Sequence, residues 1–236
     1  MIRGVLFAGL FVVSAACPPA LADTDPITET VKGRDLVYPI PATFCPLDES
    51  QPSDAATVSM MSGIYEPINR LAAVFVACGE RAAMRDGTGG MRNYATIYLT
   101  HSVVNGAVPV QRAPFVSYMR LTLEQQGAPL SEAMTRDLAD RLDETDLPIS
   151  VSEPKFVGLL AGNDEFVMSG ILLKVTNAGR EGVVAGAIAS TVINGVPINV
   201  ALYTPHENPE SLGRRIPRLE AYVDRLLRAN ALYGGP

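Results

Sequence analysis

The fold is decided by residues 155–203, which read KFVGLLAGNDEFVMSGILLKVTNAGREGVVAGAIASTVINGVPINVALY. Apolar runs rich in valine, isoleucine and alanine are separated there by Asn163-Asp164, Asn177-Ala178-Gly179 and Asn194-Gly195. Each separator has the residue types that tight turns between antiparallel strands require. The pattern predicts a four-stranded antiparallel meander with strands over residues 156–160, 166–175, 183–192 and 198–203.

The segment that follows the meander has the period of a helix. Its apolar residues form one stripe at helical spacing: Leu212, Ile216, Leu219, Val223 and Leu226. The strands before it are too apolar for both faces of their sheet to lie in water. We therefore expect this last helix to cover one face of the sheet.

The N-terminal half alternates strand and helix patterns. A strand is expected at residues 31–40, and Ser53 or Asp54, after Pro52, is a good N-cap for a helix that Pro67 ends. The remaining expected elements are strands at 71–77 and 94–99 and a pair of helices at 113–126 and 131–144.

Together these elements predict an α+β protein. Its antiparallel β-sheet, made of the C-terminal meander plus the N-terminal strands, is expected to be sandwiched by helices. Because the chain has no Gly/Ser linker and no internal repeat, residues 31–236 are expected to form a single α+β sandwich domain. Residues 23–30 are polar and lack a periodic pattern, so we expect a mobile leader there.

Residues 1–22 have the parts of a secretory signal peptide. Arg3 gives a positive start, residues 5–16 are almost wholly apolar, and Ala20-Leu21-Ala22 is a small-x-small cleavage site. The apolar run is too short to cross a bilayer, and no segment of the mature chain predicts a transmembrane helix. We expect cleavage after Ala22 and a periplasmic or secreted protein. The alternative is a lipoprotein anchored through Cys17.

Cleavage would leave two cysteines, Cys45 and Cys78. An exported protein folds in an oxidising compartment, so an even pair of cysteines predicts a disulfide. The alternative is two buried thiols. A catalytic cysteine is not expected, because neither residue has a histidine or a second cysteine beside it in the sequence.

Composition excludes two broad classes of protein. Hydrophobic residues make up 47% of the chain and charged residues only 19%, which is not the composition of a disordered chain. The chain has 19 basic and 25 acidic residues, for a net charge of −6, and no basic block. We therefore expect no nucleic-acid partner.

Residues that commonly carry chemistry are sparse. The two histidines, His101 and His206, are a hundred residues apart and lack the spacing of a metal site, so no metal and no cofactor are expected. Acidic residues on one helical face, Asp137, Asp140, Asp143 and Glu144, could offer oxygen ligands to calcium, but their regular spacing favours a solvated face. The sequence contains no motif for a nucleophilic serine and none for a phosphate loop, so no catalytic residue is assigned.

One basic cluster remains as a candidate binding site. Arg214 and Arg218 are four residues apart at the start of the last helix, near Arg215. Two guanidinium groups on one surface could bind a carboxylate, a phosphate or an acidic partner. The alternative is that they pair with nearby glutamates such as Glu210 or Glu220.

Two resemblances add to this interpretation. The order of elements over residues 31–230 resembles the PsbP-like sandwich fold, in which an antiparallel sheet lies between helices. More locally, Pro41-x-x-Phe44-Cys45-Pro46-Leu47-Asp48, Pro52-Ser53-Asp54-Ala55 and Cys78-Gly79-Glu80 are similar to a group of exported proteins of Gram-negative bacteria that has no assigned catalytic residues. The resemblance implies an exported α/β sandwich and no particular chemistry.

These observations predict an exported periplasmic protein of non-catalytic binding or accessory type. Its partner would be a protein or a small molecule of the envelope, which the sequence does not identify. The alternatives are an envelope hydrolase that uses carboxylates, since paired acids leave no sequence motif, and a lipid-anchored structural protein of the envelope.

Overall fold

The fold is given by a computed structural model that describes residues 25–66, 68–101, 109–143, 149–177 and 179–233. The expected signal peptide over residues 1–22, Cys17 with it, lies outside the described residues and stays a prediction. Within the described ranges, no helix is both long enough and apolar enough to cross a membrane.

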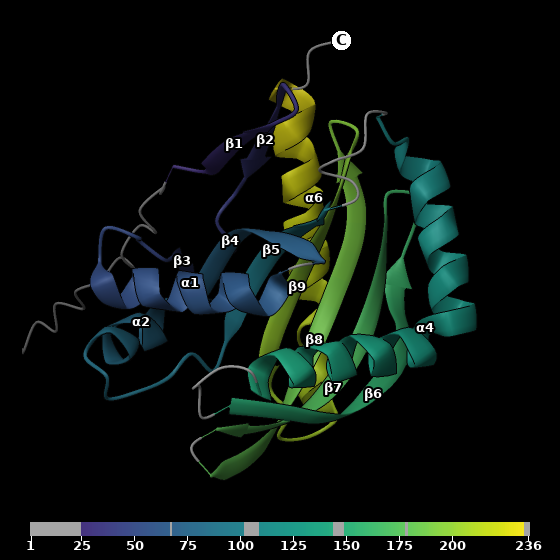
Figure 1. Cartoon of the computed structure of the whole chain (residues 1–236). Coiled ribbons are helices and arrows are strands. Elements are labelled where there is room, and N and C mark those ends of the chain that lie inside the picture. Colours follow the sequence, from purple (N-terminus) through teal and green to yellow (C-terminus); the bar gives the residue numbers. More distant parts are fainter. Residues whose placement is uncertain (1–24, 67, 102–108, 144–148, 178, 234–236) are drawn as a thin grey trace, which may run out of the picture.

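A seven-stranded antiparallel sheet forms the centre of the molecule (Figure 1). The strand order is β3-β4-β5-β9-β8-β7-β6, so the predicted meander occupies one half of the sheet and the N-terminal strands the other. β5 joins the two halves by pairing with β9, where Tyr94 lies opposite Tyr203. The α+β prediction is confirmed. The strands are β3 (Phe44–Pro46), β4 (Asn69–Ala77), β5 (Tyr94–Thr100), β6 (Ile149–Gly162), β7 (Phe166–Asn177), β8 (Arg180–Ile193) and β9 (Val196–Pro205).

The N-terminal segment differs from the prediction. Residues expected to form a mobile leader and one long strand instead make a hairpin of β1 (Ile27–Val31) and β2 (Arg34–Tyr38). The strands turn at Lys32-Gly33, where both residues have positive φ, as a two-residue hairpin turn requires. The hairpin is held from the far end of the chain, because the buried Asn230 side chain bonds both the N–H and the C=O of Val37.

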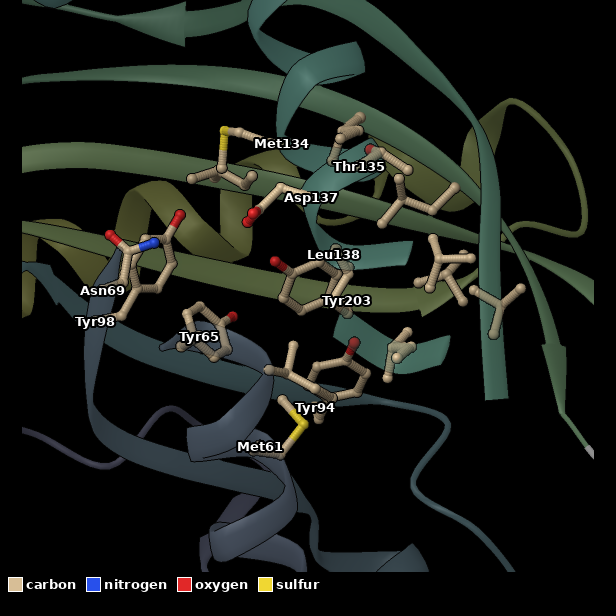
Figure 2. A pocket seen from close by; sticks show the side chains of 18 of the residues that line it. Met61, Tyr65, Asn69, Tyr94, Tyr98, Met134, Thr135, Asp137, Leu138 and Tyr203 are labelled. Carbon is tan, nitrogen blue, oxygen red and sulfur yellow. The ribbon is translucent and has the colours of Figure 1, made fainter. Parts of the chain in front are cut away.

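Helices α1 (Pro52–Tyr65) and α4 (Arg112–Asp143) lie on one face of the sheet (Figure 1). A pocket lies between them and the strands (Figure 2). The sequence predicts two helices where α4 is one. Gly127, which follows the first of the two predicted helices, is a packing residue, since a Cβ there would come 2.4 Å from the ring of Phe156. Pro129 lies inside the helix, which changes direction midway along its length (Figure 1).

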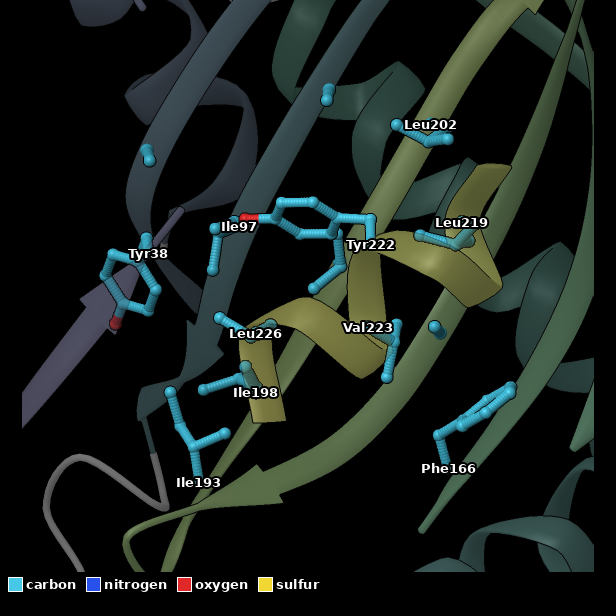
Figure 3. Close-up of a cluster of buried hydrophobic side chains, with 14 of the residues drawn as sticks. Tyr38, Ile97, Phe166, Ile193, Ile198, Leu202, Leu219, Tyr222, Val223 and Leu226 are labelled. Atoms are coloured by element: carbon cyan, nitrogen blue, oxygen red, sulfur yellow. The ribbon is translucent and has the colours of Figure 1, made fainter. Parts of the chain in front are cut away.

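The opposite face is covered by the short helix α5 (Glu210–Gly213) and by α6 (Ile216–Tyr233). Leu219, Val223 and Leu226 of α6 are fully buried against the sheet (Figure 3). The side chains of β8 that face α6 are small, Ala185, Ala187 and Ala189, and let the helix approach the strand closely. The expectation that the last helix covers the meander is confirmed.

Helix α2 (Cys78–Arg85) is absent from the sequence prediction. It begins at Cys78, which forms a disulfide with Cys45 of the edge strand β3, as predicted. Asp54, expected as an N-cap, lies inside α1, whose N-cap is Gln51. Its fully buried carboxylate accepts two hydrogen bonds from Arg85 of α2, at 3.0 and 2.6 Å. These bonds lower the pKa of Asp54 to about 2.

A candidate apolar binding pocket

A cavity of about 340 Å³ lies between the sheet and helices α1 and α4. Its floor is the sheet face that points away from α6. In a β-strand, successive side chains point to opposite faces, so alternate residues of each strand belong to the pocket and to the core under α6. On β8, Val184 and Ile188 line the pocket, while Ala185 and Ala187 between them pack under α6.

The helices supply the roof. Met60, Met61 and Ile64 come from α1, and Met134 and Leu138 come from the second half of α4. Unbranched methionine side chains adapt to irregular shapes, so a methionine-rich roof can fit ligands of varied outline.

The pocket opens to solvent between the helices. Met134 of α4 and Ile68, just before β4, both line the cavity, and both are about half exposed, at 50% and 43%. Large apolar side chains that are exposed beside a cavity are typical of a binding site, because they lose contact with water when a ligand arrives.

Four tyrosines form the aromatic part of the wall (Figure 2). The rings of Tyr65 and Tyr98 have centroids 4.8 Å apart, and those of Tyr94 and Tyr203 stack at 4.6 Å. Burial raises the pKa of all four hydroxyls above the ordinary value, so the phenols are neutral. The Tyr65 hydroxyl lies 2.7 Å from that of Thr96.

Two polar side chains lie together at one end of the pocket, apart from Thr135 and the hydroxyls of Tyr94 and Tyr203 (Figure 2). Asn69 and Tyr98 are diagonal neighbours on β4 and β5, since Asn69 pairs with Thr100. Both line the pocket and are nine-tenths buried, at 8% and 7% exposed. Among the described residues, neither the Asn69 amide nor the Tyr98 hydroxyl has a hydrogen-bond partner. In Figure 2 the Asp137 carboxylate points from α4 toward this end of the pocket.

The opposite end of the pocket is purely aliphatic. Leu173 of β7 lies opposite Val184 of β8, and Val175 lies opposite Gly182 one step further along the strands. Val151 of β6 and Leu142 of α4 close this end. These strand residues therefore offer a ligand aliphatic contacts alone.

The histidines do not come together. His101 follows the end of β5 and His206 follows the end of β9. Because the two strands are antiparallel, the histidines lie at opposite ends of the strand pair. His101 lies 2.7 Å from Glu66. Over the described part of the chain, no three metal-ligating side chains gather into a group.

The acidic face expected on a helix divides into two environments. Asp137 lines the pocket and is half-buried, so the expectation of a solvated face is wrong for this residue. Asp140 and Asp143 are exposed. Glu144 lies outside the described residues.

The arginine cluster lies away from the pocket lining. Arg214 caps the end of α5 and does not belong to the last helix. It forms an exposed ion pair at 3.6 Å with Glu210, the pairing considered as the alternative to a binding role. Arg218 is exposed on α6, and Arg215 between them donates hydrogen bonds to Asn93 and Thr204.

The sequence analysis missed the tyrosines and the roof of the pocket. One local signal was available, since Tyr94 and Tyr98 occupy alternate positions of a strand whose intervening residues, Ala95 and Ile97, are core. Aromatic residues on the second face of a half-buried strand indicate that this face is also covered. No local signal links that strand to Tyr65 or Met134.

Comparison of the chain with models of known protein families finds no match, and comparison with curated proteins finds none either. The resemblance to the PsbP-like sandwich therefore stays a prediction.

Proposed function

We propose that this protein is an exported, non-catalytic binding protein that holds a small, largely apolar molecule between its sheet and helices α1 and α4. The observation that carries the proposal is the cavity itself, about 340 Å³ of mainly aliphatic and aromatic wall with a few polar groups. Sites for small ligands have this composition in general.

The size of the cavity limits the ligand. Pockets for drug-sized molecules enclose roughly 300–1,000 Å³. A cavity at the lower end of that range suits a single alkyl chain or a small ring system better than a two-chain lipid. Binding would be driven by removal of the ligand from water, at about 0.8 kcal/mol for each buried methylene group.

Binding is favoured over hydrolysis by what the pocket offers. A hydrolase that works with carboxylates needs two of them facing one another across the substrate. Among the described lining residues, Asp137 is the single acid. An apolar ligand needs only the walls that the described residues provide. The Cys45–Cys78 disulfide is compatible with an extracytoplasmic location and supports export.

The test uses a pair of adjacent residues on β8. Val184 faces the pocket, whereas Val183 faces the other way and is exposed. We expect Val184→Phe to fill part of the cavity and to weaken binding of the neutral fluorescent probe N-phenyl-1-naphthylamine at least about tenfold. Val183→Phe should bind the probe with the affinity of the wild type. Probe fluorescence gives the affinity, and thermal melting checks that both variants are folded. Absence of probe binding to the wild type, or equal binding by the two folded variants, would refute the proposed function.

A further inference from the structure

We propose that the ligand of the pocket is a cationic amphiphile, an apolar body that carries an ammonium head group, and that this head binds beside Asp137, Tyr98 and Asn69. The inference rests on the proposed function and adds the charge class and the orientation of the ligand.

The orientation follows from the distribution of polar groups in the cavity. Asn69 and Tyr98 are nine-tenths buried, and each has a side-chain polar group that no described residue satisfies. The polar atoms of both side chains stay accessible, so a ligand that hydrogen-bonds to them is favoured at this end. The aliphatic end around Val184 and Leu173 would take the apolar body.

The opening of the pocket agrees with this orientation. Ile68, one of the two half-exposed residues at the opening, immediately precedes Asn69 in the chain. The polar end therefore adjoins a side chain that is exposed to solvent. An amphiphile bound in this direction keeps its charged head close to water, which lowers the cost of desolvating the charge.

The charge of the head group follows from the lining. Among the described lining residues there is one carboxylate, Asp137, and no lysine, arginine or histidine. A ligand carboxylate or phosphate would meet a negative charge without a compensating cation, whereas an ammonium would meet an acceptor. A carboxylate has about four lone-pair sites, so Asp137 can accept a ligand N–H and still bond the protein.

The aromatic wall favours the same charge. Tyr65 and Tyr98 pack 4.8 Å apart beside the polar end, and both phenols are neutral. The face of a neutral aromatic ring attracts a cation. The net charge of the chain, −6, adds a long-range attraction for cations.

The experiment compares three ligands with one tail and different heads, n-octylamine, n-octanol and octanoate, by isothermal titration at pH 7 below their micellar concentrations. We expect octylamine to bind at least about tenfold more tightly than octanoate, because a hydrogen bond to a charged group is worth a tenfold change or more. Octanol should lie between them.

Two variants locate the head group. Asp137→Asn should weaken octylamine about tenfold and leave octanol nearly unchanged, while Asp140→Asn, an exposed aspartate on the same helix, should alter neither. Tyr98→Phe should weaken both ligands a few-fold, whereas Tyr118→Phe, at an exposed position of α4, should not.

The outcomes separate the two proposals. If the probe binds but octanoate binds as well as octylamine, or if folded Asp137→Asn binds octylamine like the wild type, the cationic assignment is wrong and the pocket remains a binding site. If neither the probe nor any of the three ligands binds, the proposed function fails. The comparison of ligands on the wild type needs no variant, so it decides the question even if Asp137→Asn does not fold.

Discussion

Removal of the Cys45–Cys78 disulfide should destabilise the protein by about 4 kcal/mol. The bond closes a loop across a sequence separation of 33 residues. In the chain-entropy model, a cross-link over such a loop lowers the entropy of the unfolded chain by about 12.5 cal/mol/K, or about 3.7 kcal/mol at 25 °C. This is a large part of the 5–15 kcal/mol that typically separates folded from unfolded domains.

The position of the disulfide explains why few other contacts would hold β3 in its absence. Strand β3 has only three residues and lies at the edge of the sheet, paired on one side with β4. Besides that pairing, the backbone N–H of Cys78 donates to the carbonyl of Thr43, at the start of β3. The loop between the two cysteines contains all of α1, so its loss of restraint affects the roof of the pocket as well as the edge of the sheet.

The assay is urea unfolding of the Cys45→Ser/Cys78→Ser double variant and of the wild type, oxidised and reduced, with fluorescence and circular dichroism as probes. The double variant and the reduced wild type should lose stability equally, which separates the cross-link from the serine side chains. Thiol titration of the denatured, unreduced wild type should find no free thiol from this pair. A loss below about 1 kcal/mol, or two titratable thiols, would refute the reasoning.

The core, an ion pair and the N-terminus give three further predictions. Leu219→Ala, at the fully buried centre of α6, should cost about 2–5 kcal/mol in urea unfolding, and Leu219→Asp should prevent folding; a Leu219→Asp variant that melts like the wild type would contradict the placement of the helix. The bond from Arg85 lowers the pKa of buried Asp54 to about 2 from an unfolded value of 3.8, so stability of about 2 kcal/mol should be present above pH 4 and lost as the pH falls toward 2. Asp54→Asn should remove that pH dependence, measured by thermal melting. Intact-mass measurement of exported protein should find a chain beginning at Asp23, whereas a lipid-modified chain beginning at Cys17 would contradict the assigned cleavage site.

The sequence predicted the parts of the fold whose signals are local. The apolar runs and turn residues of the meander and the stripe through Leu219 and Leu226 are each contained in a short stretch of sequence, so both could be read directly. The predicted end of a helix before Gly127 is wrong. The small size of this residue serves a contact with Phe156, on a strand that follows α4 in the chain. Local helix-stop rules give no indication of such a contact.

The ion pair and the pocket were missed because their partners are distant in the chain. Asp54 after Pro52 has the local pattern of an N-cap, and its actual partner, Arg85, follows 31 residues later. The pocket joins residues from two helices and from six strands, and its aliphatic members look like ordinary core residues in the sequence. Only the three-dimensional arrangement shows that the second sheet face encloses a cavity.

The alternation of side chains along β8 constrains how this protein can diversify. Two interleaved sets of residues divide the strand into frames, a pocket frame with Val184 and Ile188 and a core frame with Ala185, Ala187 and Ala189 under α6. Point substitutions in the first frame could retune the ligand at little cost to folding. Deletion of one residue within the strand would exchange the frames, placing Val184 and Ile188 where only alanines fit. Variants with new specificities should therefore differ by replacement within the strands, and length changes should be tolerated only in the turns between them.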